Sequence, residues 1–93
     1  MNAPSNQYDQ VAYPGFSYAQ AHPDRLAVIA TLFGMSPAPA ERCRVLELGC
    51  GDGWNLLPMA AALPESTFVG LDLAGQPIAS GRAIVERLGL KNL

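Results

Sequence analysis

The chain has 93 residues, of which 49% are hydrophobic and 15% are charged, and its formal net charge is -2. This length allows one small domain, and the composition is that of a globular protein rather than a disordered one. The six basic residues are scattered, which gives no electrostatic signal for a nucleic-acid partner. No apolar stretch approaches the ~20 residues that span a bilayer, and the first residues lack the features of a signal peptide. We therefore expect no membrane partner and a cytoplasmic location.

Residues 1–20 are predicted to form an extended N-terminal arm, and residues 21–93 to form the domain itself. The arm is polar, contains the turn signal Pro14-Gly15, and shows no lasting helical or strand period. Its aromatic residues are Tyr8, Tyr13, Phe16 and Tyr18. The arm is therefore either a poorly ordered terminus or a lid that lays aromatic rings over a ligand.

The first helix is predicted to begin at Pro23, where a missing N–H is harmless, and to stop at Gly34. Apolar residues recur at helical spacing on one of its faces, namely Leu26, Ile29, Ala30 and Phe33. His22 stands immediately before this helix. Because no second histidine and no ligand cluster accompany it, we interpret His22 as a turn or capping residue and expect no metal site.

Strands and helices alternate through the rest of the chain. The predicted elements are a strand over 43–48, a helix over 55–63 with Asn55 as N-cap, a strand over 67–71, and a helix from Gln76-Pro77 to Leu88 that ends at Gly89. Residues 90–93 resemble the approach to a third strand.

Strands that alternate with helices predict a parallel sheet with right-handed crossovers. The expected fold class is therefore α/β, as the N-terminal part of a Rossmann-like doubly wound parallel sheet in the order helix, strand, helix, strand, helix. Two strands cannot cover their own apolar faces and those of three helices, so we expect the sheet to be incomplete.

A glycine-rich loop follows the first predicted strand, and Asp72 ends the second. The phosphate-binding P-loop is excluded because Gly53 is followed by Trp54 and Asn55 instead of lysine and serine or threonine. The NAD fingerprint would place its third glycine at position 54, where an indole should push helix and strand apart. NAD binding is therefore disfavoured, although Gly49 and Gly51 alone would fit it.

The two cysteines, Cys43 and Cys50, lie on either side of the first predicted strand. A disulfide between them would compete with extended geometry, so we expect reduced thiols. No base is evident near Cys50. We therefore interpret it as a small residue where the backbone comes close to a ligand, and not as a nucleophile.

The pattern Glu47-x-Gly49-x-Gly51-x-Gly53 resembles the first motif of class I S-adenosylmethionine-dependent methyltransferases. Asp72 matches the acid with which that family binds the ribose of its cofactor. The resemblance implies that Gly49, Cys50 and Gly51 contact S-adenosyl-L-methionine through their backbones, that Asp72 accepts from the ribose hydroxyls, and that Leu73 faces adenine. Glu47 would orient the loop or reach the amino end through water, unless it only caps backbone N–H groups at the strand end.

A closer resemblance covers nearly the whole chain, including Tyr8-Asp-Gln-Val-Ala-Tyr13-Pro and His22-Pro-Asp-Arg-Leu26. These segments are similar to bacterial methyltransferases that carry a C-terminal regulatory domain and are related to protein-lysine methyltransferases. The chain departs from that group at Ala12 and Ala21.

The closer resemblance implies a protein-lysine acceptor. In folds of this kind the acceptor's base and substrate pocket come from later strands, so we name no catalytic residue and expect the chain alone to bind the cofactor weakly or not at all and to be inactive. A fragment of an NAD(P)-binding oxidoreductase and a non-catalytic Rossmann-like binding module remain as alternatives.

Overall fold

The computed structural model describes residues 16–93, so Tyr8 and Tyr13 of the predicted arm lie outside the described residues. The elements in chain order are η1 (Ala19–Ala21), α2 (Pro23–Leu32), η2 (Ala40–Arg42), β1 (Arg44–Leu48), α3 (Leu56–Ala62), β2 (Thr67–Leu71) and α4 (Gly75–Leu88). Every helix and strand predicted over residues 21–89 is confirmed, with boundaries that differ by one or two residues. No helix within residues 16–93 has both the length and the apolar character that crossing a bilayer requires.

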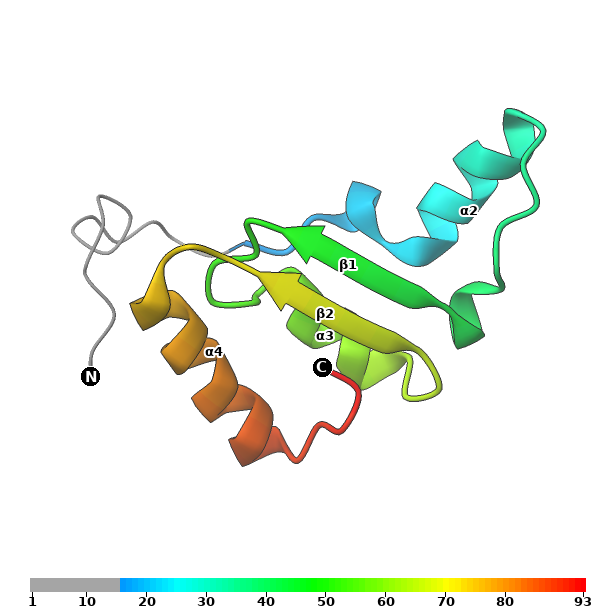
Figure 1. Cartoon of the computed structure of the whole chain (residues 1–93). Helices are drawn as coiled ribbons and strands as arrows, with labels where there is room; N and C mark the ends of the chain where they lie inside the picture. Colours follow the sequence, from blue (N-terminus) through cyan, green and yellow to red (C-terminus); the bar gives the residue numbers. More distant parts are fainter. Residues whose placement is uncertain (1–15) are drawn as a thin grey trace.

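β1 and β2 lie side by side as a parallel pair, with Val45 opposite Phe68 and Leu48 opposite Leu71 (Figure 1). The helix α3 connects them, as parallel strands require a crossover between the end of one and the start of the next. This arrangement confirms the α/β prediction. It also brings the ends of both strands, and the loops that follow them, to the same edge of the sheet.

The core lies between α3 and one face of the sheet. Leu56, Met59 and Ala60 of α3 pack with Phe68 of β2, and each of them is at most 5% exposed. Side chains alternate along a strand, so the opposite face of the sheet carries another set of residues. This set remains 48–74% exposed and comprises Leu46, Leu48, Val69 and Leu71.

The helix α2 stands away from this core and contacts η1 and η2 (Figure 1). Its predicted apolar face is uncovered, since Leu26 is 49% and Phe33 is 83% exposed. His22 is the N-cap of α2, and its Nδ1 accepts a 3.2 Å hydrogen bond from the backbone N–H of Asp24. The capping interpretation of His22 is therefore confirmed.

Asn92 fastens the segment after α4 to both layers of the core. Its backbone carbonyl accepts a 2.7 Å hydrogen bond from the N–H of Phe68 in β2. That N–H points to the edge of β2 away from β1, because successive N–H groups of a strand alternate between edges. Residues 90–93 therefore approach β2 where a third strand would pair. The Asn92 side chain also donates to the carbonyls of Ala60, Leu63 and Ser66, two of which end α3.

Candidate functional site

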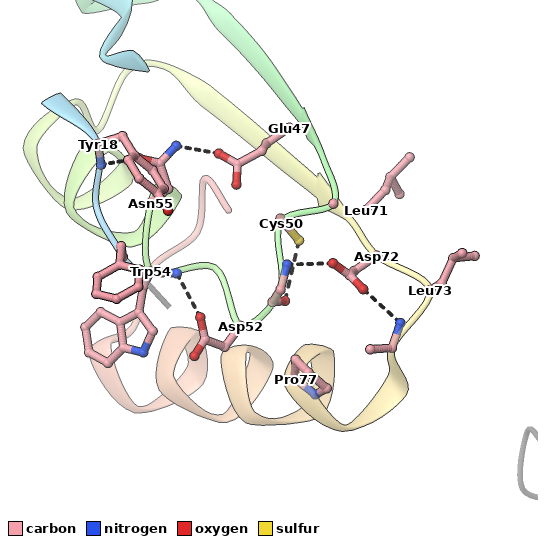
Figure 2. Close-up of a pocket in the computed structure, with 14 residues that line it drawn as sticks. Tyr18, Glu47, Cys50, Asp52, Trp54, Asn55, Leu71, Asp72, Leu73 and Pro77 are labelled. Atoms are coloured by element: carbon pink, nitrogen blue, oxygen red, sulfur yellow. Dashed lines mark hydrogen bonds between the residues drawn. The ribbon is translucent and has the colours of Figure 1, made fainter. Parts of the chain in front are cut away.

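A cavity of about 670 Å³ opens beyond the carboxyl ends of β1 and β2, and Figure 2 shows its lining. Ligands of open α/β sheets bind at this edge, where the loops after the strands diverge. All six residues predicted to contact a cofactor line this one cavity: Glu47, Gly49, Cys50, Gly51, Asp72 and Leu73. The structure thus brings together what the sequence separates by as many as 26 positions.

The loop between β1 and α3 has a backbone that requires glycine. Gly49, Gly51 and Gly53 have φ angles of 74°, 59° and 87°, in the left-handed region that other residues enter only with strain. A Cβ placed on Gly49 or Gly51 would meet no atom within 4 Å. These two positions therefore leave open space beside the backbone, and their identity is set by conformation rather than by crowding.

Most N–H groups of this loop are already hydrogen-bonded inside the chain. Their acceptors are the Leu71 carbonyl for Gly49 and Cys50, the Asp72 carboxylate for Gly51, the Cys50 carbonyl for Gly53, and the Asp52 carboxylate for Trp54. A loop that cradles phosphate instead turns its N–H groups towards the ligand. Hydrogen bonds within the chain therefore fix the conformation of this loop, and few of its N–H groups remain to bind an anion.

Asp72 ties the end of β2 to the glycine loop. Its Oδ2 accepts from the N–H of Gly51 and its Oδ1 accepts from the N–H of Ala74, both at 2.8 Å (Figure 2). The sequence predicted only a ligand role for this carboxylate and missed these two contacts. Because an ionised carboxylate offers about four lone-pair sites, each oxygen can still accept a further hydrogen bond from a ligand hydroxyl.

The prediction of Asn55 as the N-cap of α3 is confirmed by its position, but its side chain makes no capping hydrogen bond. Its own backbone is helical, with φ -75° and ψ -36°, whereas a capping side chain needs an extended backbone. Its Nδ2 instead donates to Oε2 of Glu47, and its Oδ1 accepts from the N–H of Tyr18 at 2.8 Å. The partner of Glu47 is therefore a side-chain amide, rather than the backbone N–H groups of the strand-end alternative.

Cys50 lies beside the carboxylates of the site. Burial raises the pKa of its thiol, and the charges of Asp72 and Glu47 raise it further. The thiol is therefore protonated at neutral pH, which removes the thiolate that a nucleophile requires. Cys43 and Cys50 form no disulfide with each other in this structure.

Trp54 does not crowd the helix and the strand, so that prediction is wrong. The residue is 44% exposed and lines the cavity. The close approach to the loop is made by Gly81 of α4, where a Cβ would collide with the backbone carbonyl of Asp52. A glycine inside a helical pattern was the available signal for this contact.

One wall of the cavity is aromatic; the lid alternative for the N-terminal arm named Phe16 and Tyr18, whereas the sequence missed Trp54. Phe16, Tyr18 and Trp54 line it with exposed fractions of 57%, 48% and 44%. The Phe16 and Tyr18 rings meet edge to face at 6.4 Å between centroids, and Ser17 Oγ donates to the Trp54 carbonyl at 2.6 Å. The aromatic content of the arm hinted at this wall, but its contact with residues 54 and 55 spans 37 positions and left no local pattern.

Comparison with known proteins gives relatives that are all longer than this chain. Protein RP789 of Rickettsia prowazekii is 43% identical over 91 residues, which are 98% of this chain and 16% of that protein. A tRNA (guanine-N(7)-)-methyltransferase of Chloroflexus aggregans is 36% identical over 74 residues, which are 77% of this chain and 31% of that enzyme.

A solved structure agrees in fold as well as in sequence. The structure of PKMT2 from Rickettsia typhi in complex with AdoHcy matches with a TM-score of 0.79 and 36% identity. The match covers 87% of this chain and 16% of that one, so the chain spans about a sixth of PKMT2. A family model described as "Putative methyltransferase" matches residues 41–93, which is more than half of the chain and includes β1, the glycine loop and β2. The chain belongs to this methyltransferase family.

Proposed function

We propose that this chain forms the cofactor-binding part of an S-adenosylmethionine-dependent methyltransferase. The observation that carries the proposal is the single cavity in which the glycine loop and Asp72 meet at the ends of two parallel strands. The crystallised relative PKMT2, which is 36% identical, holds AdoHcy, the product that remains after S-adenosylmethionine has donated its methyl group.

The geometry of the cavity supports the roles that the resemblance implies. Asp72 accepts from the two ribose hydroxyls with the lone pairs that Gly51 and Ala74 leave unused. Leu73, which is 80% exposed at the rim, presents an apolar surface to adenine. Gly49, Cys50 and Gly51 admit the ligand close to the backbone. Glu47, held by Asn55, faces the positively charged amino end.

The charge of the cavity supports this cofactor over NAD. Glu47, Asp52 and Asp72 line it, and none of its lining residues within 16–93 is basic. A pyrophosphate there would meet three carboxylates and a loop whose N–H groups are mostly used, whereas S-adenosylmethionine brings a sulfonium and an ammonium.

Methyl transfer from a sulfonium is an in-line displacement, so the protein mainly aligns donor and acceptor. We propose a protein side chain, such as lysine, as the acceptor, following the resemblance to protein-lysine methyltransferases. The acidic lining supports an amine acceptor over a polyanionic RNA, which the tRNA methyltransferase relative leaves as the competing class. We further propose a cytoplasmic protein in which residues 1–20 form an arm and residues 21–93 form the binding unit. The groups that act on the acceptor would lie in the part of the longer relatives that this chain does not span.

Isothermal titration tests this proposal, after circular dichroism has shown that the chain is folded. We expect weak but saturable binding of S-adenosylmethionine and AdoHcy and no binding of NAD. The Asp72→Ala variant should bind about tenfold more weakly or worse, because hydrogen bonds to a charged group contribute roughly 1.5–3 kcal/mol each. Glu65→Ala removes the same charge from an exposed turn and should leave binding intact. Binding of NAD, or equal binding by the Asp72→Ala variant, would refute the proposal.

A further inference from the structure

Three residues from distant parts of the chain, Glu47, Asn55 and Tyr18, form a chain of hydrogen bonds at one end of the cavity, called the relay below. Asn55 donates through Nδ2 to Glu47 and accepts through Oδ1 from the backbone N–H of Tyr18 (Figure 2). Only 8% of Asn55 is exposed. A buried amide is held strongly by its partners, because leaving either end unpaired carries the full desolvation penalty. The relay therefore joins β1 to the segment that precedes η1.

The segment that the relay holds, residues 16–18, is part of the aromatic wall. Two hydrogen bonds attach it to the start of α3: Tyr18 N–H to Asn55, and Ser17 Oγ to the Trp54 carbonyl. Phe16 and Tyr18 remain about half exposed. Docking therefore leaves about half of each ring in water, and the two hydrogen bonds fix the position of the segment against the start of α3.

We propose that Asn55 is a positioning residue, which docks residues 16–18 against the cavity by binding the Tyr18 N–H and the Glu47 carboxylate at once. The inference rests on the proposed function, because the wall that it builds belongs to the proposed cofactor site. An amide suits this task because it donates and accepts simultaneously, which neither a carboxylate nor an apolar side chain can do. Ligand affinity then falls in proportion to the undocked fraction of the segment.

A reciprocal exchange of the two side chains tests the relay. Asn55→Asp keeps an acceptor for Tyr18 but sets a second carboxylate against Glu47, and should shift the docking equilibrium about tenfold or more towards the undocked state. Adding Glu47→Gln should restore docking. In the double variant the introduced amide donates to the introduced carboxylate, which still accepts from Tyr18, and the net charge equals that of the wild type.

Docking is read on the ligand-free protein, so this readout does not depend on the cofactor assignment. Amide hydrogen exchange measured by NMR reports the protection of the Tyr18 N–H. Acrylamide quenching of Trp54, the single tryptophan of the chain, reports the exposure of the wall. We expect faster Tyr18 exchange and stronger quenching in Asn55→Asp, and values near the wild type in the double variant. AdoHcy titrated into Asn55→Asp should show a lower affinity, by at most the factor by which the docking equilibrium shifts, which is about tenfold.

A matched control separates the relay from net charge. Asp52→Asn, combined with Asn55→Asp, removes one cavity carboxylate as Glu47→Gln does, but Asp52 bonds to the Trp54 N–H and lies outside the relay. Unchanged Tyr18 protection in Asn55→Asp, or equal rescue by Asp52→Asn and Glu47→Gln, would overturn the inference. If Asn55→Asp fails to fold, the double variant Asn55→Asp/Glu47→Gln provides the test. An unprotected Tyr18 N–H in the folded double variant would also overturn the inference. If hydrogen exchange follows the predicted pattern but the wild type does not bind AdoHcy, the role of Asn55 stands and the proposed function is refuted.

Discussion

Two helices of this chain were both predicted from the sequence and have opposite environments. In α3, residues Leu56, Leu57, Met59 and Ala60 are all buried, whereas α2 buries only Pro23 at its first position. Apolar residues recur at helical spacing in α2, whereas all seven residues of α3 are apolar. Periodicity therefore shows that a segment is helical and which face is apolar, but it does not show whether another part of the chain covers that face.

The candidate site is built on the packed side of this comparison. The glycine loop lies between β1 and α3, and Asp72 follows directly after β2. The aromatic wall is attached to the same start of α3 by hydrogen bonds from residues 17 and 18. The site therefore depends on α3, and α2 should be tolerant of change.

Paired truncations should show the largest difference between the two helices. Leu56→Ala opens a cavity at a side chain that is 1% exposed and should lower the free energy of unfolding by about 2–5 kcal/mol. Leu26→Ala, at a side chain that is 49% exposed, should change it by about 0.5 kcal/mol or less. Urea unfolding measures both. Equal losses would mean that α2 is covered in solution.

The contact between α4 and the loop can be tested with two glycines of the same helix. Gly81→Ala forces a Cβ against the Asp52 carbonyl and should cost about 1–3 kcal/mol of unfolding free energy, with a shift in Trp54 emission as the loop moves. Gly75→Ala has open space and should change stability by about 1 kcal/mol or less. A neutral Gly81→Ala would show that the loop and α4 are not in rigid contact.

The smallest expected effect concerns Cys50 at alkaline pH. Burial and the neighbouring carboxylates raise the pKa of its folded thiol, so above about pH 8.5 the folded state holds a proton that the unfolded state has lost. Stability should therefore decline as the pH rises through this range. Cys50→Ala should remove this part of the decline, and Cys43→Ala, which retains Cys50, should keep it. Unfolding curves from pH 7 to 10 measure this decline. If the Cys50 thiol is not responsible, the free energy of unfolding will decline equally in Cys50→Ala and Cys43→Ala.

The sequence predicted most of the fold because the relevant signals are local. Gly89 ends α4 and Pro23 begins α2, each through a backbone preference of the residue itself. The glycine loop and Asp72 were recognisable for the same reason, since parallel strands bring their carboxyl ends to one edge. The role of Gly81 and the exposure of Trp54 could not be predicted, because both depend on how α4 and the loop approach each other in space.

Asn55 illustrates the same limit within the site. Its position before α3 predicted a cap, and the position was right, but its side chain found partners in β1 and in residue 18. A short polar side chain at a helix start can satisfy the helix or bridge to other segments. Only the tertiary arrangement decides between these two uses.

Asn92 has a consequence for the order in which this molecule folds. It hydrogen-bonds to Ala60, Leu63, Ser66 and Phe68, between 24 and 32 positions back along the chain. During synthesis, α3 and β2 emerge from the ribosome well before residue 92 is available. Until then the last carbonyls of α3 and the outer edge of β2 must be solvated by water, and these groups are the most exposed to wrong pairing. Residue 92 therefore forms these hydrogen bonds late, and they satisfy one N–H on the outer edge of β2 and two carbonyls at the end of α3.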